Sequence, residues 1–247
     1  GNITSTGFNH NDNNWVLIDS PWVAADFKAE FEQMFAGRFG YSKGVPQPGE
    51  PGYGNRYVVG DTTVEVHFSP QEDAMGRILE SVENAKESIE FFIFAFTKDQ
   101  LGSLFISKHH EFQRYNRCCG PAYQQLSNED VVECEPVRAT CEVPFRERYV
   151  RGVIDRSQLH SNGPYHEAYR LLSYGIDMRM DGNDNSYQPG DYQAGGGRQH
   201  SKTLVIDGQT ENPVVLTGSF NWSSSATIAN DETLLVIEGP RVGHQYH

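Results

Sequence analysis

The stretch VEVHFSPQEDAMGRILESVENAKESIEFFIFAFT, residues 64–97, decides the fold class. Apolar and polar residues alternate over Thr63 to Phe68, which predicts a half-buried strand, and the continuous apolar run Ile89 to Phe96 predicts a buried one. Residues 72–86 between them carry apolar side chains at helical spacing, which predicts an amphipathic helix. The stretch is therefore expected to fold as a strand-helix-strand unit.

Elements of the same kinds continue in both directions from this unit. The expected helices are Val23 to Phe35, Asp99 to Phe112 and Pro164 to Tyr174, and the expected strands are Trp15 to Ile18, Tyr149 to Ile154, Asp177 to Met180 and Thr203 to Ile206. Residues 181–197 are rich in Gly, Asn, Asp and Tyr and predict a long loop. This alternation predicts an α/β fold with a mixed, mostly parallel β-sheet flanked by helices on both faces.

Composition narrows the range of functions. The chain has 247 residues, 37% of them hydrophobic, and its longest apolar runs are of strand length, well below the roughly 20 residues of a membrane-spanning helix. We therefore expect no integral membrane segment. The formal net charge is -13, which disfavours unaided binding of a polyanion such as duplex DNA.

Four cysteines, Cys118, Cys119, Cys134 and Cys141, fall in a segment of about residues 114–146 that reads as an insertion between two elements. Their spacing lacks the paired C-x-x-C and His pattern of a zinc site, so disulfides are expected. Disulfides indicate an oxidising compartment, hence a secreted or periplasmic protein. Free thiols in a cytoplasmic protein are the alternative.

The N-terminal residues repeat near the C-terminus at a constant offset of 219 positions. Identical pairs are Asn2 with Asn221, Ser5 with Ser224, Asn11 with Asn230, Asp12 with Asp231, Ile18 with Ile237, Pro21 with Pro240 and Val23 with Val242. A duplicated unit is the simplest explanation, with residues 1–42 as the C-terminal tail of a first lobe. A Gly/Pro-rich linker is then expected over residues 43–61, and a second lobe over residues 62–247.

The chemistry-bearing pattern is His200-Ser201-Lys202, then Asp207, then Gly218-Ser219-Phe220-Asn221, then Glu232. His200 and Lys202 are two residues apart, so on a strand their side chains project from one face. An imidazole can attack phosphorus or move a proton, and an ammonium beside it binds a phosphate oxygen. A serine hydroxyl, an asparagine amide and a glycine turn add hydrogen-bond donors and close backbone approach. The set suits phosphoryl transfer.

This pattern resembles the phospholipase D superfamily, whose signature is H-x-K-x4-D, then G-S-x-N, then a Glu eleven residues after the Asn, as Glu232 follows Asn221 here. Residues 64–97, the segment VRGVIDRS and the segment LLSYGIDMRMDG resemble the family's other strands, so the likeness covers residues 62–247. The N-terminal residues resemble the end of a first G-S-x-N motif with Asn2 as its Asn. The first H-x-K-D motif would precede Gly1.

The resemblance implies that two such motifs meet, one His forming a phosphohistidine while the other protonates the leaving alcohol, with no cofactor or metal. It assigns His200 as the general acid that later activates water, with nucleophile as its alternative role. The implied catalytic set is His200, Lys202, Asp207 and Glu232, in which Asp207 is structural and Glu232 orients His200; the phosphate-binding set is Gly218, Ser219, Asn221 and Asn2, with help from Lys202. Two departures are a longer spacing between Asp207 and Gly218, and Asn13 in the first copy where the second has Glu232.

Three functions remain open from the sequence. The preferred one is hydrolysis of a phospholipid head-group phosphodiester through a phosphohistidine. The alternatives are an endonuclease that cleaves DNA or RNA, and a catalytically silent phosphate-binding module. The expected partners are a phosphodiester substrate, nucleic acid being possible, and either an upstream lobe or a second copy of the chain that completes the two-His site.

Overall fold

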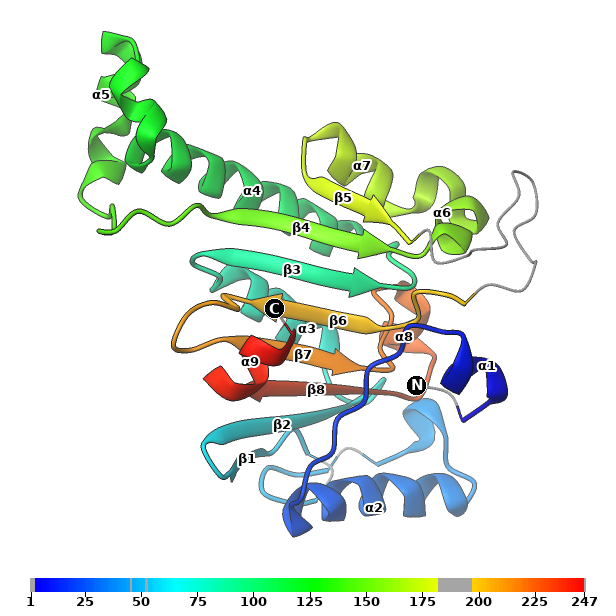
Figure 1. The fold of residues 1–247 in the computed structure, drawn as a ribbon. Helices are drawn as coiled ribbons and strands as arrows, with labels where there is room; N and C mark the ends of the chain where they lie inside the picture. The colour runs from blue at the N-terminus through cyan, green and yellow to red at the C-terminus, as the bar shows by residue number, and fades with distance from the viewer. Residues whose placement is uncertain (1–2, 45, 52, 182–196, 247) are drawn as a thin grey trace.

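The computed structural model describes residues 3–44, 46–51, 53–181 and 197–246, which contain one eight-stranded mixed sheet (Figure 1). Along the sheet the order is β1-β2-β8-β7-β6-β3-β4-β5. The strands are β1 (Arg56–Val59), β2 (Thr62–Ser69), β3 (Ser88–Ile93), β4 (Tyr149–Ile154), β5 (Asp177–Met180), β6 (Lys202–Ile206), β7 (Val214–Gly218) and β8 (Glu232–Glu238).

The α-helices of the described residues are α1 (Ser5–Asn9), α2 (Pro21–Phe35), α3 (Ala74–Glu83), α4 (Asp99–Cys119), α5 (Asn128–Arg138), α6 (Arg156–Asn162), α7 (Glu167–Ser173), α8 (Ser224–Ile228) and α9 (Pro240–Tyr246). Short 3-10 turns cover Gly40–Ser42, Pro121–Gln125 and Gly163–Tyr165. In Figure 1, α3 and α4 lie behind the sheet while α2 and α9 lie in front of it. The prediction of an α/β fold with helices on both faces is confirmed.

The expectation of a mostly parallel sheet is wrong. Among the described strands, β3 with β4 and β4 with β5 are the parallel pairs, and the other five pairings are antiparallel. Parallel neighbours need a long crossover connection, which α4 supplies before β4 and α6 with α7 supply before β5. A short connection joins β6 to β7, so these strands run antiparallel.

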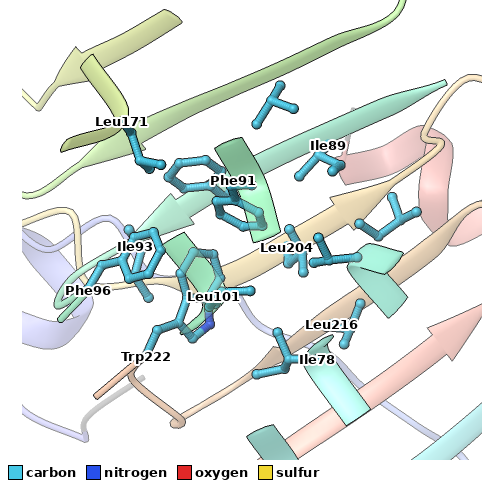
Figure 2. Packing of buried hydrophobic residues seen from close by; sticks show 14 of the residues in the cluster. Ile78, Ile89, Phe91, Ile93, Phe96, Leu101, Leu171, Leu204, Leu216 and Trp222 are labelled. Atoms are coloured by element: carbon cyan, nitrogen blue, oxygen red, sulfur yellow. The ribbon is translucent and has the colours of Figure 1, made fainter. Parts of the chain in front are cut away.

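Apolar side chains form a separate core on each face of the sheet. The larger cluster lies under α3, α4 and α7, and Figure 2 shows Phe91 of β3 at its centre beside Trp222 and Leu101. Gly152 of β4 makes room for that ring, because a Cβ atom there would lie 2.3 Å from Phe91. The smaller cluster joins β2, β6, β7 and β8 to α2 and α9. The alternating residues of the strands thus face opposite cores, which fixes the register of the sheet.

The cysteine-bearing segment, expected as an insertion between two elements, is largely helical. The helix α4 continues to Cys119, well past the expected end at Phe112, and α5 folds back against it. Disulfides join Cys118 to Cys134 and Cys119 to Cys141, so the prediction of disulfides is confirmed. The first disulfide joins α4 to α5, and the second joins α4 to the segment that follows α5, so both crosslinks hold the folded-back segment against α4.

Two local expectations fail near the N-terminus. The strand β1 occupies part of residues 43–61, which Gly and Pro had indicated to be without regular structure, because it pairs with β2 across the tight turn before Thr62. Residues 15–18, expected as a strand, are extended but belong to no sheet. In Figure 1 they cross the front face of the sheet between α1 and α2. Val16 and Ile18 pack there against the smaller core.

Among the described residues, no helix is long and apolar enough to cross a membrane. Most of the predicted loop over residues 181–197 lies outside the described residues.

Candidate active site

Four strand ends meet at one edge of the sheet and position the candidate residues. The end of β3 pairs with the start of β6, where Ile93 lies opposite Lys202. The end of β7 pairs with β8, where Gly218 lies opposite Leu234, two residues after Glu232. The antiparallel order therefore brings the H-x-K segment, the G-S-x-N turn and Glu232 to the same edge, although they are up to 32 residues apart in sequence.

The side chains at this edge line a pocket of about 230 Å³. Its lining residues are Asn13, Asn14, His200, Lys202, Gly218, Ser219, Asn221 and Glu232. Six of these come from the predicted motif, and two come from the N-terminal segment. The structure thus brings together the imidazole, the ammonium and the amide and hydroxyl groups that phosphoryl transfer requires.

His200 lies between the N-terminal segment and the end of β3. Its backbone N–H donates to the carbonyl of Asp12 at 3.1 Å, and its ring contacts the edge or face of Phe94 with centroids 4.6 Å apart. Burial lowers the pKa of His200 to about 4, with the charges of Lys202 and Arg198 adding to the effect. The imidazole is therefore neutral at pH 7, with a ring nitrogen able to accept a proton or to attack phosphorus.

Lys202 is a buried ammonium held against the same aromatic ring. Its Nζ donates to the carbonyl of His200 at 2.5 Å and lies 4.7 Å from the centroid of Phe94. Burial lowers the pKa of Lys202 to about 8, and the negative charges of Glu232 and Asp155 oppose that change. The side chain is mostly charged at pH 7, and because it is desolvated it interacts strongly with an anion in the pocket.

The turn from Gly218 to Asn221 has the backbone geometry that only glycine allows at its first position. Gly218 has φ of 150°, and a Cβ atom there would lie 2.1 Å from the carbonyl oxygen of Thr233. Ser219 is locked to β8 by two bonds of 3.0 Å, its N–H donating to Thr233 O and its Oγ accepting from Thr233 N. Asn221 Oδ1 accepts from Ala95 N at 3.3 Å, which directs the amide nitrogen away from that backbone.

Glu232 lines the pocket without bonding to the imidazole. Its Oε1 accepts from Asn230 Nδ2 at 3.0 Å, and its charge acts on Lys202. No hydrogen bond joins Glu232 to His200 in the part of the chain that the structure describes. In this structure the carboxylate therefore supports the ammonium, and its orienting role toward His200 stays a prediction.

Asp207 lies at the opposite end of β6, outside the pocket. Its carboxylate accepts hydrogen bonds from the backbone N–H groups of Lys86, Glu87 and Ser88, the shortest at 2.6 Å. It also has φ of 53°, in the left-handed region. These bonds fasten the turn before β3 to the end of β6, and this agrees with a structural role. Asn2 lies outside the described residues.

Two residues, one beside the pocket and one lining it, were not singled out as site residues from sequence. Phe94 follows β3 directly and underlies both His200 and Lys202. Asn14 donates through Nδ2 to Thr217 Oγ1 at 2.6 Å and to the Tyr246 hydroxyl at 2.9 Å. Strand pairing could have indicated Phe94: β3 pairs with β6, so the residue that directly follows β3 lies beside the His200 and Lys202 side chains.

A family described as "Cardiolipin synthase, PLD-like domain" matches residues 122–247, just over half of the chain. The chain belongs to the phospholipase D superfamily. The match includes the H-x-K-D and G-S-x-N segments and β4 to β8, so the matched region holds most of the residues that line the pocket.

Individual relatives are distant in sequence. The chain is 21% identical over 188 residues to "Mitochondrial cardiolipin hydrolase" of Chlamydomonas reinhardtii, which covers 76% of this chain and 60% of that relative's length. Among solved structures, the phospholipase D family member Nuc of Salmonella typhimurium is 21% identical with a TM-score of 0.46, covering 75% of this chain and 90% of Nuc. NucT of Helicobacter pylori is 18% identical with a TM-score of 0.49, covering 75% of this chain and 91% of NucT.

Proposed function

We propose that this protein is a phosphodiesterase of the phospholipase D type that hydrolyses the head-group phosphodiester of a phospholipid. One observation carries the proposal: a single pocket holds a neutral imidazole, a desolvated ammonium and the Ser219 and Asn221 side chains. These are a proton-transfer group, a charge for the phosphate and donors for its non-bridging oxygens. Members of this superfamily use such sets for phosphodiester chemistry.

The reaction proceeds in two steps with a second His from another copy of the motif. The second imidazole attacks phosphorus, the bond from phosphorus to the head-group oxygen breaks, and His200 gives its proton to that oxygen as the alcohol leaves. Water then attacks the phosphohistidine while His200 takes a proton from it, which releases the second imidazole and phosphatidic acid. Lys202, Ser219 and Asn221 bind the phosphate oxygens in both steps.

The low pKa of His200 places a condition on the first step. At neutral pH the imidazole is neutral in the absence of substrate, so it must acquire its proton when the phosphodiester arrives. A bound phosphate anion offsets the charge of Lys202 and raises the pKa of His200 toward that requirement. In the second step the neutral imidazole is the form that activates water. A nucleophilic role for His200 needs no such uptake and is the alternative assignment.

A lipid substrate is favoured over nucleic acid. The family description and the relative from Chlamydomonas both name cardiolipin chemistry. The chain's net charge of -13 opposes binding of a nucleic acid, whose affinity rests on neutralising several phosphates. The two disulfides further support an oxidising compartment, which we propose as a secreted or periplasmic location.

The test is an activity comparison on the assembly that brings two copies of the motif together, whether in one polypeptide or in a dimer of this chain. Phosphate-ester cleavage is measured on vesicles of cardiolipin or phosphatidylcholine and on supercoiled and single-stranded DNA. We expect turnover on vesicles and loss of at least about a thousandfold in His200→Ala. The control is His244→Ala, an exposed His on α9 at the other end of the sheet.

Each outcome distinguishes the candidates. Cleavage of DNA alone contradicts the lipid substrate and supports the nuclease. Binding of phosphate without any cleavage supports the silent binding module. Full activity in His200→Ala refutes the site itself.

A further inference from the structure

Phe94 carries an aromatic ring from the end of β3 to the edge of the sheet where the pocket lies. The centroid of this ring lies 4.6 Å from the centroid of the His200 imidazole, with an angle of 64° between the two planes. The same centroid lies 4.7 Å from Lys202 Nζ. One side chain beside the pocket therefore contacts both the imidazole and the ammonium of the H-x-K segment.

The backbone on both sides of Phe94 is fixed by the sheet and by the G-S-x-N turn. Ile93, the last residue of β3, pairs with Lys202 of β6. The N–H of Ala95 donates to Asn221 Oδ1 at 3.3 Å. Because Phe94 is held between these two anchors, its ring has a defined position relative to the residues proposed to bind phosphate.

The ring is a suitable partner for an ammonium that is out of water. Lys202 is 6% exposed, and burial of a charged group without a partner is costly. A cation close to the face of an aromatic ring is attracted by the ring quadrupole, and the attraction is stronger when the cation is desolvated. A neutral ring stabilises the ammonium without cancelling its charge, so the charge stays available to an anion in the pocket.

Two carboxylates also act on Lys202, but neither takes the place of the ring. The negative charges of Glu232 and Asp155 favour the charged form of the side chain. In the part of the chain that the structure describes, however, Lys202 forms no ion pair, and its Nζ contacts the carbonyl of His200 and the ring of Phe94. Both of these groups are uncharged. The direct contacts of the ammonium therefore leave its positive charge uncompensated.

The same ring restricts the His200 imidazole. Packing of the two rings covers part of the imidazole and limits rotation of its plane. Burial is the largest cause of the low pKa of His200, and the charges of Lys202 and Arg198 add to it. Phe94 thus contributes to that burial and holds the imidazole and the ammonium at a fixed spacing.

We propose that Phe94 is a positioning residue of this site: its ring holds the ammonium of Lys202 and the imidazole of His200 in place before a phosphodiester arrives, and leaves the ammonium charged for the phosphate oxygens. This role rests on the proposed function, because it gives Phe94 a task in that reaction. An aliphatic side chain of similar size would fill the same space but lacks the ring quadrupole. Position 94 therefore requires an aromatic residue.

The test measures the titration of Lys202 directly in the chain of residues 1–247. The carbon resonance of Lys202 Cε, assigned by its loss in Lys202→Arg, is followed by NMR from pH 6 to pH 10. The unsubstituted chain should titrate near pH 8. Phe94→Leu should lower the midpoint by about one pH unit, because the ammonium loses its cation–π contact in a desolvated site. Phe94→Tyr keeps the ring and should keep the midpoint.

Phe92→Leu is the matched control, since it removes a ring from the same strand two residues earlier. Phe92 is half-buried and lines a different pocket, so its loss should lower the melting temperature but leave the titration of Lys202 unchanged. In the unsubstituted chain, NOEs from the Phe94 ring protons to the His200 ring protons and to the Lys202 Cε protons give a second measurement, which needs no variant.

Binding of dimethyl phosphate gives a third measurement. With the midpoint one pH unit lower, Phe94→Leu should bind this anion about fivefold more weakly than the unsubstituted chain at pH 8, and equally within about twofold at pH 6.

An unchanged midpoint in Phe94→Leu would overturn the proposal, as would an equal fall in Phe94→Tyr or in Phe92→Leu, or absence of the NOEs. Failure of the proposed function has a different signature. An assembly that binds dimethyl phosphate but cleaves neither lipid nor nucleic acid argues against the phosphodiesterase, while the lowered midpoint in Phe94→Leu still supports Phe94 as a positioning residue for phosphate binding.

Discussion

The buried ammonium of Lys202 should make phosphate binding lose strength as the pH rises through 8. Burial lowers the pKa of Lys202 to about 8 against an ordinary value of 10.5. A phosphodiester anion binds the charged form, so affinity is full below that pKa and declines above it. The charged fraction falls from about 0.9 at pH 7 to about 0.03 at pH 9.5, which predicts binding that is about 30-fold weaker at the higher pH.

Dimethyl phosphate is the suitable ligand because it carries one negative charge throughout this range. Its dissociation constant is measured by calorimetry or NMR titration at pH 7, 8 and 9.5. The pKa of His200 is about 4 in the free protein, and any proton that the imidazole takes up on phosphate binding adds a pH dependence that Lys202→Arg retains. Lys202→Arg is the control, since a guanidinium keeps its charge at pH 9.5 and should remove the part of the pH dependence that Lys202 causes. A constant affinity in the unsubstituted protein, or an equal decline in Lys202→Arg, would refute the reasoning.

Three further outcomes are expected. The His200 imidazole should titrate near pH 4 by NMR and at a higher pH in Lys202→Met, which removes a neighbouring positive charge; a titration near 6.5 in the unsubstituted chain contradicts the site electrostatics. Asp207→Ala should lower the free energy of unfolding by about 3 kcal/mol or more, measured in urea, because three backbone N–H groups lose their acceptor. A loss below about 1 kcal/mol argues against the role of Asp207 in anchoring the turn before β3. Glu65 and Glu72 outweigh burial and raise the pKa of His67 to about 9, so its contribution to stability is full below pH 6.5 and lost as the pH rises through 9. The stability gap between the unsubstituted chain and His67→Gln should accordingly shrink by about 3 kcal/mol from pH 6 to pH 9.5, and a constant gap would disprove the linkage.

The sequence predicted most of the site because its residues are fixed by local rules. Lys202 begins β6 and His200 precedes it by two residues, so their spacing places both at the entry to one strand, and the glycine turn before Ser219 has a backbone that other residues cannot adopt. Those constraints act within a few residues and are visible in the chain. The superfamily, the α/β class and the disulfides were predictable for the same reason.

What the sequence did not reveal depends on contacts between distant segments. The approach of Asn14 to the pocket follows from its bonds to Thr217 and Tyr246, more than 200 residues away. The expectation of a mostly parallel sheet was wrong because strand direction depends on which strands become neighbours. The spacing of apolar residues in the sequence does not show which strands these are. Residues 15–18 are an apolar run of strand length but lack pairing partners among the described residues, so the pattern alone misled.

The two disulfides of the α4–α5 region lie far from the pocket residues, so their formation and reduction do not involve the groups proposed to react. Cys118 and Cys119 are consecutive on α4, so their side chains diverge by roughly 100°; one is joined to Cys134 of α5 and the other to Cys141 in the segment after α5. In Figure 1, α5 lies at the end of the sheet away from the ends of β3 and β7, where the pocket residues come together. A thiol reductant should therefore loosen this peripheral pair of helices and leave the geometry of the pocket unchanged.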